Sequence, residues 1–186
     1  MIRSTHQICL TEQQDKNTMK NTFCIILLFC FTSAAFCQEG FERWNERYTK
    51  VNLTGVMKYE TAYADSVDRG LIEGRYYARF DRYQIKAEYL GMTRDVADSI
   101  RTSMKNVNKL FGEKEFLPVI TAVQKEFLFR VDGTDYWFPI QHVLEKAFQD
   151  EIMLHDTVIL YCMHFNEHQW NKALYNSFLI AEFRKE

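Results

Sequence analysis

Cysteine is almost absent from the part of this chain that can form a folded domain. Cys9, Cys24, Cys30 and Cys37 all lie within the first 37 residues, and only Cys162 follows them. A domain with a single cysteine cannot form an internal disulfide, so its stability has to come from packing. The 15 Phe, 10 Tyr and 3 Trp of the chain supply the apolar area for that packing.

Motifs for phosphate binding and for the common hydrolytic reactions are also missing. The seven glycines are scattered, and none form the GxGxxG or GxxxxGK[ST] loop that holds a phosphate. The chain has no GxSxG, HExxH or CxxC motif. Its formal net charge of −2 lacks the basic excess that attracts nucleic-acid phosphates. These absences argue against nucleic-acid partners and favour a protein that is not an enzyme.

Residues 1–37 have the character of a targeting segment. Residues 1–18 are polar, whereas Met19-Lys20 leads into nine apolar residues, FCIILLFCF, at 23–31. A basic start, a short apolar run and a small-residue exit are typical of a secretory signal peptide, and a membrane-spanning helix would need about 20 apolar residues. We therefore predict Met19 as the true start, cleavage after Cys37 or Ala35, and an exported protein, periplasmic or extracellular, without a transmembrane segment after cleavage.

Cys37 could instead carry a lipid anchor, because lipoproteins are acylated on a cysteine that follows the apolar run. The residue before such a cysteine is usually small, whereas Phe36 is bulky. We therefore expect no lipid at Cys37.

The chain from 38 to 114 has mainly helical periodicity. Apolar residues recur every three or four positions over Phe41–Val67, which predicts one helix or two helices separated at Asn52–Gly55. Leu71–Leu90 fits both a helix and an alternating strand, and we predict a helix because the helical match is longer. Thr93 is expected to cap a third helix. The predicted buried face of that helix comprises Val96, Ile100, Met104, Val107, Leu110 and Phe111.

Residues 115–186 are rich in aromatic and β-branched types. Lys125–Val131 and Thr134–Phe138 flank Asp132-Gly133, which predicts a β-hairpin. A helix with Pro139 in its first turn is expected to follow. Thr157–Phe165 is apolar on both of its alternating faces, so it should be a strand buried on both sides at the centre of the sheet.

A polar loop is expected from Asn166 to Lys172, followed by a last strand over Ser177–Phe183. The predicted fold class is therefore α+β. About three N-terminal helices precede a small, strongly bent antiparallel sheet, or an SH3-like or OB-like partial barrel, with one inserted helix. The helical half (38–114) and the β-rich half (115–186) are expected to fold together.

His164 and His168 form the one close histidine pair, and Cys162 lies beside them. Such a set could hold copper or zinc. The spacing works best on a helix, however, and here it would lie across a strand end and a loop. A cysteine inside a doubly apolar strand is most simply a core residue rather than a nucleophile. No cofactor is therefore the first expectation, and a Cu or Zn site is the alternative.

Tyr136, Trp137 and Phe138 are consecutive and cannot all face inward on one strand. If Tyr136 and Phe138 face the core, Trp137 faces a helix or a partner, as tryptophan does at many interfaces. Trp137 and Tyr136 are thus the candidate contacts with an unknown protein or small ligand. The leading prediction is an exported, non-catalytic binding or accessory protein. The alternatives are a metal-handling or enzymatic protein using His164 and His168, and a self-associating structural component.

Overall fold

The structure is a computed structural model that describes residues 40–72, 77–111 and 114–186. The predicted signal peptide, with Met19, Ala35 and Cys37, lies outside the described residues. The chain divides into two compact units, Met1–Trp44 and Asn45–Glu186. Residues 40–44 begin a helix that continues to residue 47. The sheet lies in the second unit. No helix in the described ranges is long and apolar enough to cross a membrane.

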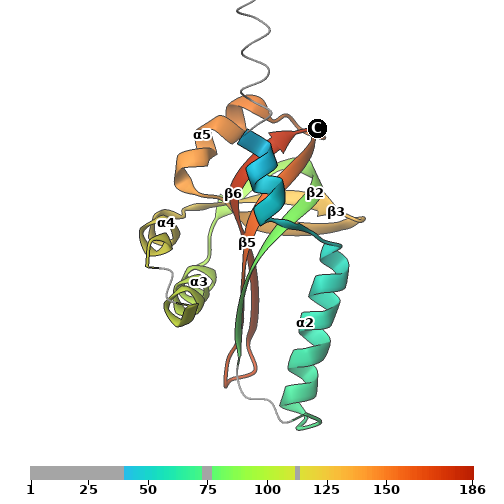
Figure 1. Ribbon diagram of the computed structural model, residues 1–186, viewed down its shortest axis with the longest axis vertical. Coiled ribbons are helices and arrows are strands. Elements are labelled where there is room, and N and C mark those ends of the chain that lie inside the picture. Colours follow the sequence, from blue (N-terminus) through green and yellow to red (C-terminus); the bar gives the residue numbers. More distant parts are fainter. Residues whose placement is uncertain (1–39, 73–76, 112–113) are drawn as a thin grey trace, which may run out of the picture. The chain divides into compact units, whose positions relative to one another are not determined.

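A six-stranded sheet forms the centre of the second unit (Figure 1). Its strands lie in the order β4-β3-β2-β5-β6, with β1 pairing in parallel with β2 and every other pair antiparallel. The strands are β1 (Thr49–Lys50), β2 (Ala78–Asp95), β3 (Lys125–Val131), β4 (Thr134–Pro139), β5 (Thr157–His168) and β6 (Leu174–Lys185). The α+β class is therefore confirmed.

Strand β2 is shared between the two halves of the sheet. Its first part, Ala78–Glu88, pairs with β5, and its last part, from Glu88 to Asp95, pairs with β3 with a register shift between Tyr89 and Thr93. Gly91 lies at this shift with a φ of 70°, a conformation that favours glycine. Among the described residues, one isolated bridge, between Ile140 after β4 and Ile180 of β6, joins the two ends of the strand order, so the sheet is bent but not closed into a barrel.

The predicted helix over Leu71–Leu90 is wrong, because its described residues from Ala78 onward belong to β2. Both periodicities match this segment, and pairing with β5 and β3 decides between them. Ile85, Ala87 and Tyr89 alternate into the core, as residues on one face of a strand do.

The helices are interspersed among the strands instead of gathered at the N-terminus as predicted. They are the helix over 40–47, α2 (Leu53–Asp68), α3 (Asp98–Phe111), α4 (Phe116–Ala122) and α5 (His142–Glu151). In Figure 1, α2 and α3 lie on opposite sides of β2, β5 and β6. The short helix α4 was not predicted, and Pro139 ends β4 instead of opening α5.

Two helix boundaries follow from local residues. Of the two predictions for Phe41–Val67, two separate helices is correct, because α2 begins after Asn52, whose side chain accepts a hydrogen bond from the Gly55 amide at 2.7 Å. Thr93 does not cap α3, since it pairs with β3 inside β2. Of the predicted buried face of α3, Met104 and Val107 are buried, whereas Leu110 and Phe111 are exposed.

The prediction for the central strand is confirmed. Strand β5 lies between β2 and β6, and its side chains from Val158 to Asn166 are buried on both faces. The strand continues to His168, so the loop predicted from Asn166 begins three residues too early. The β3–β4 hairpin is also confirmed, with Asp132 and Gly133 both at positive φ in its turn.

Candidate functional site

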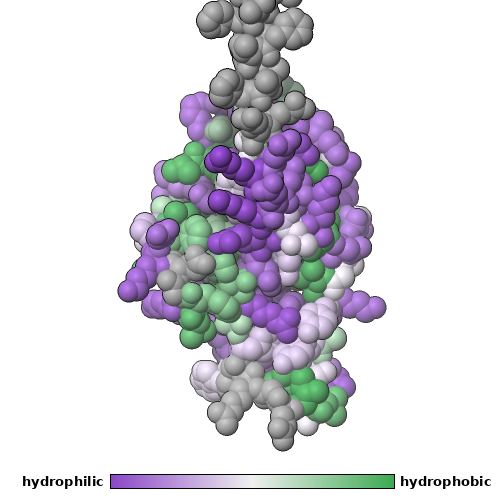
Figure 2. All heavy atoms as spheres, viewed as in Figure 1, coloured by the Kyte–Doolittle hydropathy of each residue, from purple (hydrophilic) through white to green (hydrophobic). Residues whose placement is uncertain are grey.

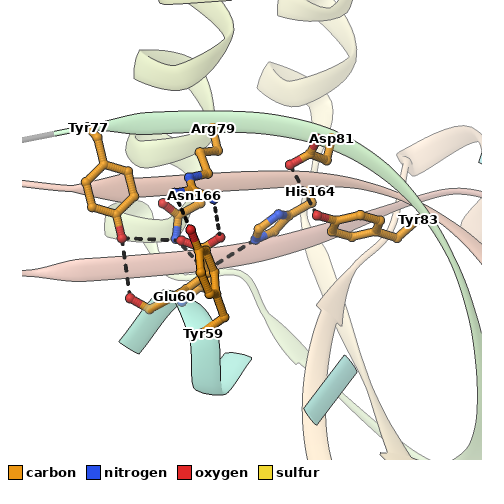
Figure 3. A network of polar contacts seen from close by, with 9 residues as sticks. Tyr59, Glu60, Tyr77, Arg79, Asp81, Tyr83, His164 and Asn166 are labelled. Carbon is orange, nitrogen blue, oxygen red and sulfur yellow. Dashed lines mark hydrogen bonds and ion pairs between the residues drawn. The ribbon is translucent and has the colours of Figure 1, made fainter. Parts of the chain in front are cut away.

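Polar side chains replace apolar ones along the face of β5 that is covered by α2. Leu160 and Cys162 belong to the apolar core, and the next residues on the same face are His164, Asn166 and His168, all buried. Arg79 and Asp81 accompany them on β2 (Figure 3). Buried polar groups need hydrogen-bond partners, so the contacts of this region define what it can do.

Glu60 of α2 is buried against β2 and is held by two partners. Its carboxylate lies 3.4 Å from the Arg79 guanidinium, and the Tyr77 hydroxyl donates to it at 3.3 Å (Figure 3). Burial raises the pKa of Glu60 above its ordinary value, although Arg79 and Tyr77 act in the opposite direction. These contacts fix the middle of α2 to the sheet.

The Arg79 guanidinium is surrounded by tyrosine rings. It lies 5.1 Å from the ring centroids of Tyr59 and Tyr63 and 5.4 Å from that of Tyr77. Cation–π attraction of this kind adds to the ion pair with Glu60. The Tyr77 ring is therefore held in a defined position by contacts on its hydroxyl and on its face.

His164 is held as a neutral ring inside the sheet–helix interface. Its Nε2 lies 3.2 Å from the Asn176 side-chain oxygen, which also accepts from the Asn166 amide at 2.6 Å. The ring stacks on Phe178 with centroids 4.5 Å apart. Burial lowers the pKa of His164 to about 4, so the ring is uncharged at neutral pH and donates from Nε2 to Asn176.

His168 is buried at the end of the same face. Its Nε2 lies 3.2 Å from the Asp68 carboxylate at the end of α2, and its ring centroid is 5.5 Å from that of Tyr77. His168 and Tyr77 therefore lie at the boundary between the buried polar network and the surface.

An open pocket of about 380 Å³ lies on the other side of this boundary, at the end of the β5–β6 hairpin. Its lining combines apolar, aromatic and polar side chains from β2, α3 and the end of β5. The lining residues are Tyr77, Ala78, Asn106, Leu110, Glu167, His168, Gln169 and Trp170. Both the volume and this mixture are typical of sites for small molecules.

Large apolar side chains at this pocket are exposed to solvent. Trp170 is 77% exposed and Leu110 is 72% exposed. Phe111 of α3 and Leu117 of α4 extend the exposed apolar surface, and Figure 2 shows apolar side chains gathered over these two helices. Exposed apolar groups beside a concave site indicate binding.

Glu167 is oriented in the pocket by neutral donors. The Asn106 amide donates to its Oε1 at 3.0 Å, and the Gln169 amide donates to its Oε2 at 3.0 Å. No Lys or Arg of the described segments forms an ion pair with Glu167, whereas Glu60 and Glu126 each pair with an arginine. Glu167 thus presents a fixed and unneutralised carboxylate.

The aromatic residues predicted as binding contacts lie on opposite faces of β4. Tyr136 lines a second, wider hollow of about 600 Å³ against α2. Trp137 is half-buried, and the Arg94 guanidinium lies over its ring at 4.2 Å. The structure does not bring Tyr136 and Trp137 into one site, and a partner contact at either residue stays a prediction.

The residues predicted as metal ligands share one face of β5 but have other partners. Burial raises the pKa of the Cys162 thiol, and Cys162 belongs to the apolar core. His164 contacts Asn176, and His168 contacts Asp68. Within the described ranges, no group of three or more His, Cys, Asp or Glu side chains could hold a metal ion. A role for His164 and His168 in metal binding stays a prediction.

Several pocket residues were not found from the sequence. Asn106, Glu167 and Tyr77 come from three separate segments of the chain, and no spacing relates them. Trp170 did carry a signal, because it is a tryptophan in a polar stretch between two strands. Comparisons with known protein families, curated proteins and solved structures found no match. A proposal for function therefore rests on the geometry of the site.

Proposed function

We propose that this protein is an exported, non-catalytic binding protein that takes a small ligand in the pocket lined by Trp170, Glu167 and His168. The observation that carries the proposal is the pocket itself, about 380 Å³ in volume, with an exposed tryptophan beside oriented polar groups. Tryptophan is enriched among the residues that dominate binding energies. Export is supported by the signal-like N-terminal sequence.

The polar groups of the pocket are held in place before any ligand arrives. Tyr77 is anchored on Glu60, His168 on Asp68, and the Glu167 carboxylate on two amides. Such preorganisation lowers the entropic cost of binding. It supports a site that recognises a ligand through fixed contacts.

The same contacts favour holding a ligand over transforming it. Both oxygens of Glu167 already accept amide hydrogen bonds, and the Cys162 thiol lies in the core outside the pocket lining. A nucleophile next to a general base is the usual requirement for covalent catalysis. The metal-handling and self-association alternatives stay predictions from the sequence.

Trp170→Ala tests the proposed function. We expect fragments detected by ligand-observed NMR with the full chain to bind at least about tenfold more weakly to this variant, because removing a binding tryptophan costs about 2 kcal/mol or more. The free energy of unfolding should change by about 0.5 kcal/mol or less, since Trp170 is exposed.

Trp137→Ala is the matched control, because it removes the same side chain at a half-buried position outside the pocket. Fragment binding to this variant should equal that of the original protein. Two results would contradict the proposal. One is that fragments bind to the Trp170→Ala variant as tightly as to the original protein, and the other is that only the Trp137→Ala variant loses fragment binding.

A further inference from the structure

We infer that the ligand of this pocket is a small organic cation, an amine or guanidine with an apolar portion, whose charged group pairs with Glu167. The inference rests on the proposed function, since it names the class of ligand that the same pocket takes. Its starting point is the charge of the lining, whose described residues include Glu167 and His168 but no Lys or Arg.

The hydrogen bonds of Glu167 leave room for a cation. Asn106 and Gln169 use one acceptor position on each carboxylate oxygen, and each oxygen can accept a second bond. Amide donors fix the orientation of the carboxylate without cancelling its charge. A ligand ammonium or guanidinium would supply the charge that Arg79 supplies to Glu60 and Arg94 supplies to Glu126.

A second acidic group, Asp68, contacts a residue of the pocket lining. The Asp68 carboxylate lies 3.2 Å from the Nε2 of His168 and so adds a second negative charge next to a residue of the lining. No Lys or Arg among the described lining residues would receive an anionic ligand beside Glu167, and like charges in one site repel. The charge arrangement therefore selects against carboxylate and phosphate ligands.

The remaining lining residues suit the other parts of such a cation. Tyr77 and Trp170 offer aromatic rings, which attract ammonium and guanidinium groups through their π faces. Leu110 and Ala78 offer apolar contacts for a hydrocarbon portion. Carboxylate, aromatic rings and apolar contacts together describe a site for an amine that carries an apolar group.

The test compares three probes that share one ring and differ in charge: benzylamine, benzyl alcohol and benzoate. Their affinities for the full chain are measured by NMR titration at low ionic strength, where an exposed charge pair is least screened. We expect benzylamine to bind at least about tenfold more tightly than benzyl alcohol, and benzoate to bind most weakly.

Glu167→Gln keeps the shape of the side chain and removes its charge. In this variant the preference for benzylamine should disappear, while the affinity for benzyl alcohol stays within about twofold. Glu151→Gln, an exposed carboxylate at the end of α5, is the matched control and should keep the preference. A thermal unfolding curve for each variant establishes that it is folded.

The outcomes separate the two proposals. Benzyl alcohol or benzoate binding as tightly as benzylamine overturns the cation inference and leaves the binding function standing. A preference for benzylamine that persists in the Glu167→Gln variant also overturns the inference. Binding of none of the three probes to the pocket counts against the proposed function itself.

Discussion

Phe148→Ala should lower the free energy of unfolding by about 3–5 kcal/mol, the usual cost of removing a buried phenylalanine ring. Phe148 of α5 is fully buried inside the bend of the sheet. Its ring centroid lies 5.1 Å from that of Tyr89, 5.0 Å from that of Phe127, 5.7 Å from that of Phe129 and 5.0 Å from that of Phe183. The truncated side chain would leave a cavity among four aromatic rings from three strands.

Val143→Ala provides the control on the same helix, because Val143 is 80% exposed. Its effect should be about 0.5 kcal/mol or less. Both free energies come from urea denaturation, with similar slopes indicating the same unfolded state. A loss below about 1 kcal/mol for Phe148→Ala would show that α5 does not fill the bend of the sheet.

The stability of the protein should fall with pH through the buried histidine. In the folded state the pKa of His164 is about 4, because the ring is buried, whereas the value for an unfolded chain is about 6.5. Between about pH 4 and about pH 6.5, the unfolded chain therefore binds a proton on His164 that the folded protein does not bind. The contribution of neutral His164 to stability is fully present above about pH 6.5 and is lost as the pH falls toward 4. The loss amounts to about 2 kcal/mol between pH 7 and pH 4.5.

His164→Gln isolates this contribution. The original protein and the variant are unfolded with urea at pH 7 and at pH 4.5, and the loss of stability on acidification is compared. Other groups, among them Glu60 with its raised pKa, titrate in both proteins and cancel in the comparison. Asp81 and Arg79 act on His164 in opposite directions. The same acid-dependent loss in both proteins would show that His164 is not held neutral by the fold.

Local composition was enough to predict some elements. Thr157–Phe165 is apolar on both faces and rich in β-branched and aromatic residues, which favours a strand covered on both sides. Asp132-Gly133 predicts its turn because both residues accept positive φ in a two-residue hairpin. These predictions are confirmed because residues within a few positions of each other decide the outcome.

Where two patterns coexist, tertiary contacts decide. Over Leu71–Leu90 the helical and the strand periodicities both fit, and β5 on one side and β3 on the other select the strand. The polar residues Asn166 and His168 suggested a loop, yet they continue β5, and Asn176 and Asp68 give them polar contacts in the interior. A single sequence does not contain those distant partners in recognisable form.

The pocket could not have been predicted for the same reason. Tyr77, Asn106 and Trp170 meet only because β2 and β5 pair while α3 lies against them. The histidines singled out by their spacing lie near the end of β5 that borders the pocket. His168 lines the pocket, and His164 belongs to the buried network behind it.

An amide NMR map of benzylamine binding to the full chain tests the central claim most directly. If the pocket at the end of the β5–β6 hairpin is the binding site, the largest chemical-shift changes should fall on Tyr77, Ala78, Gln169 and Trp170, including the Trp170 indole. Changes centred on Tyr136 and on α2 between Thr54 and Asp65, which line the wider hollow, would contradict this assignment, as would a spectrum that does not change at all.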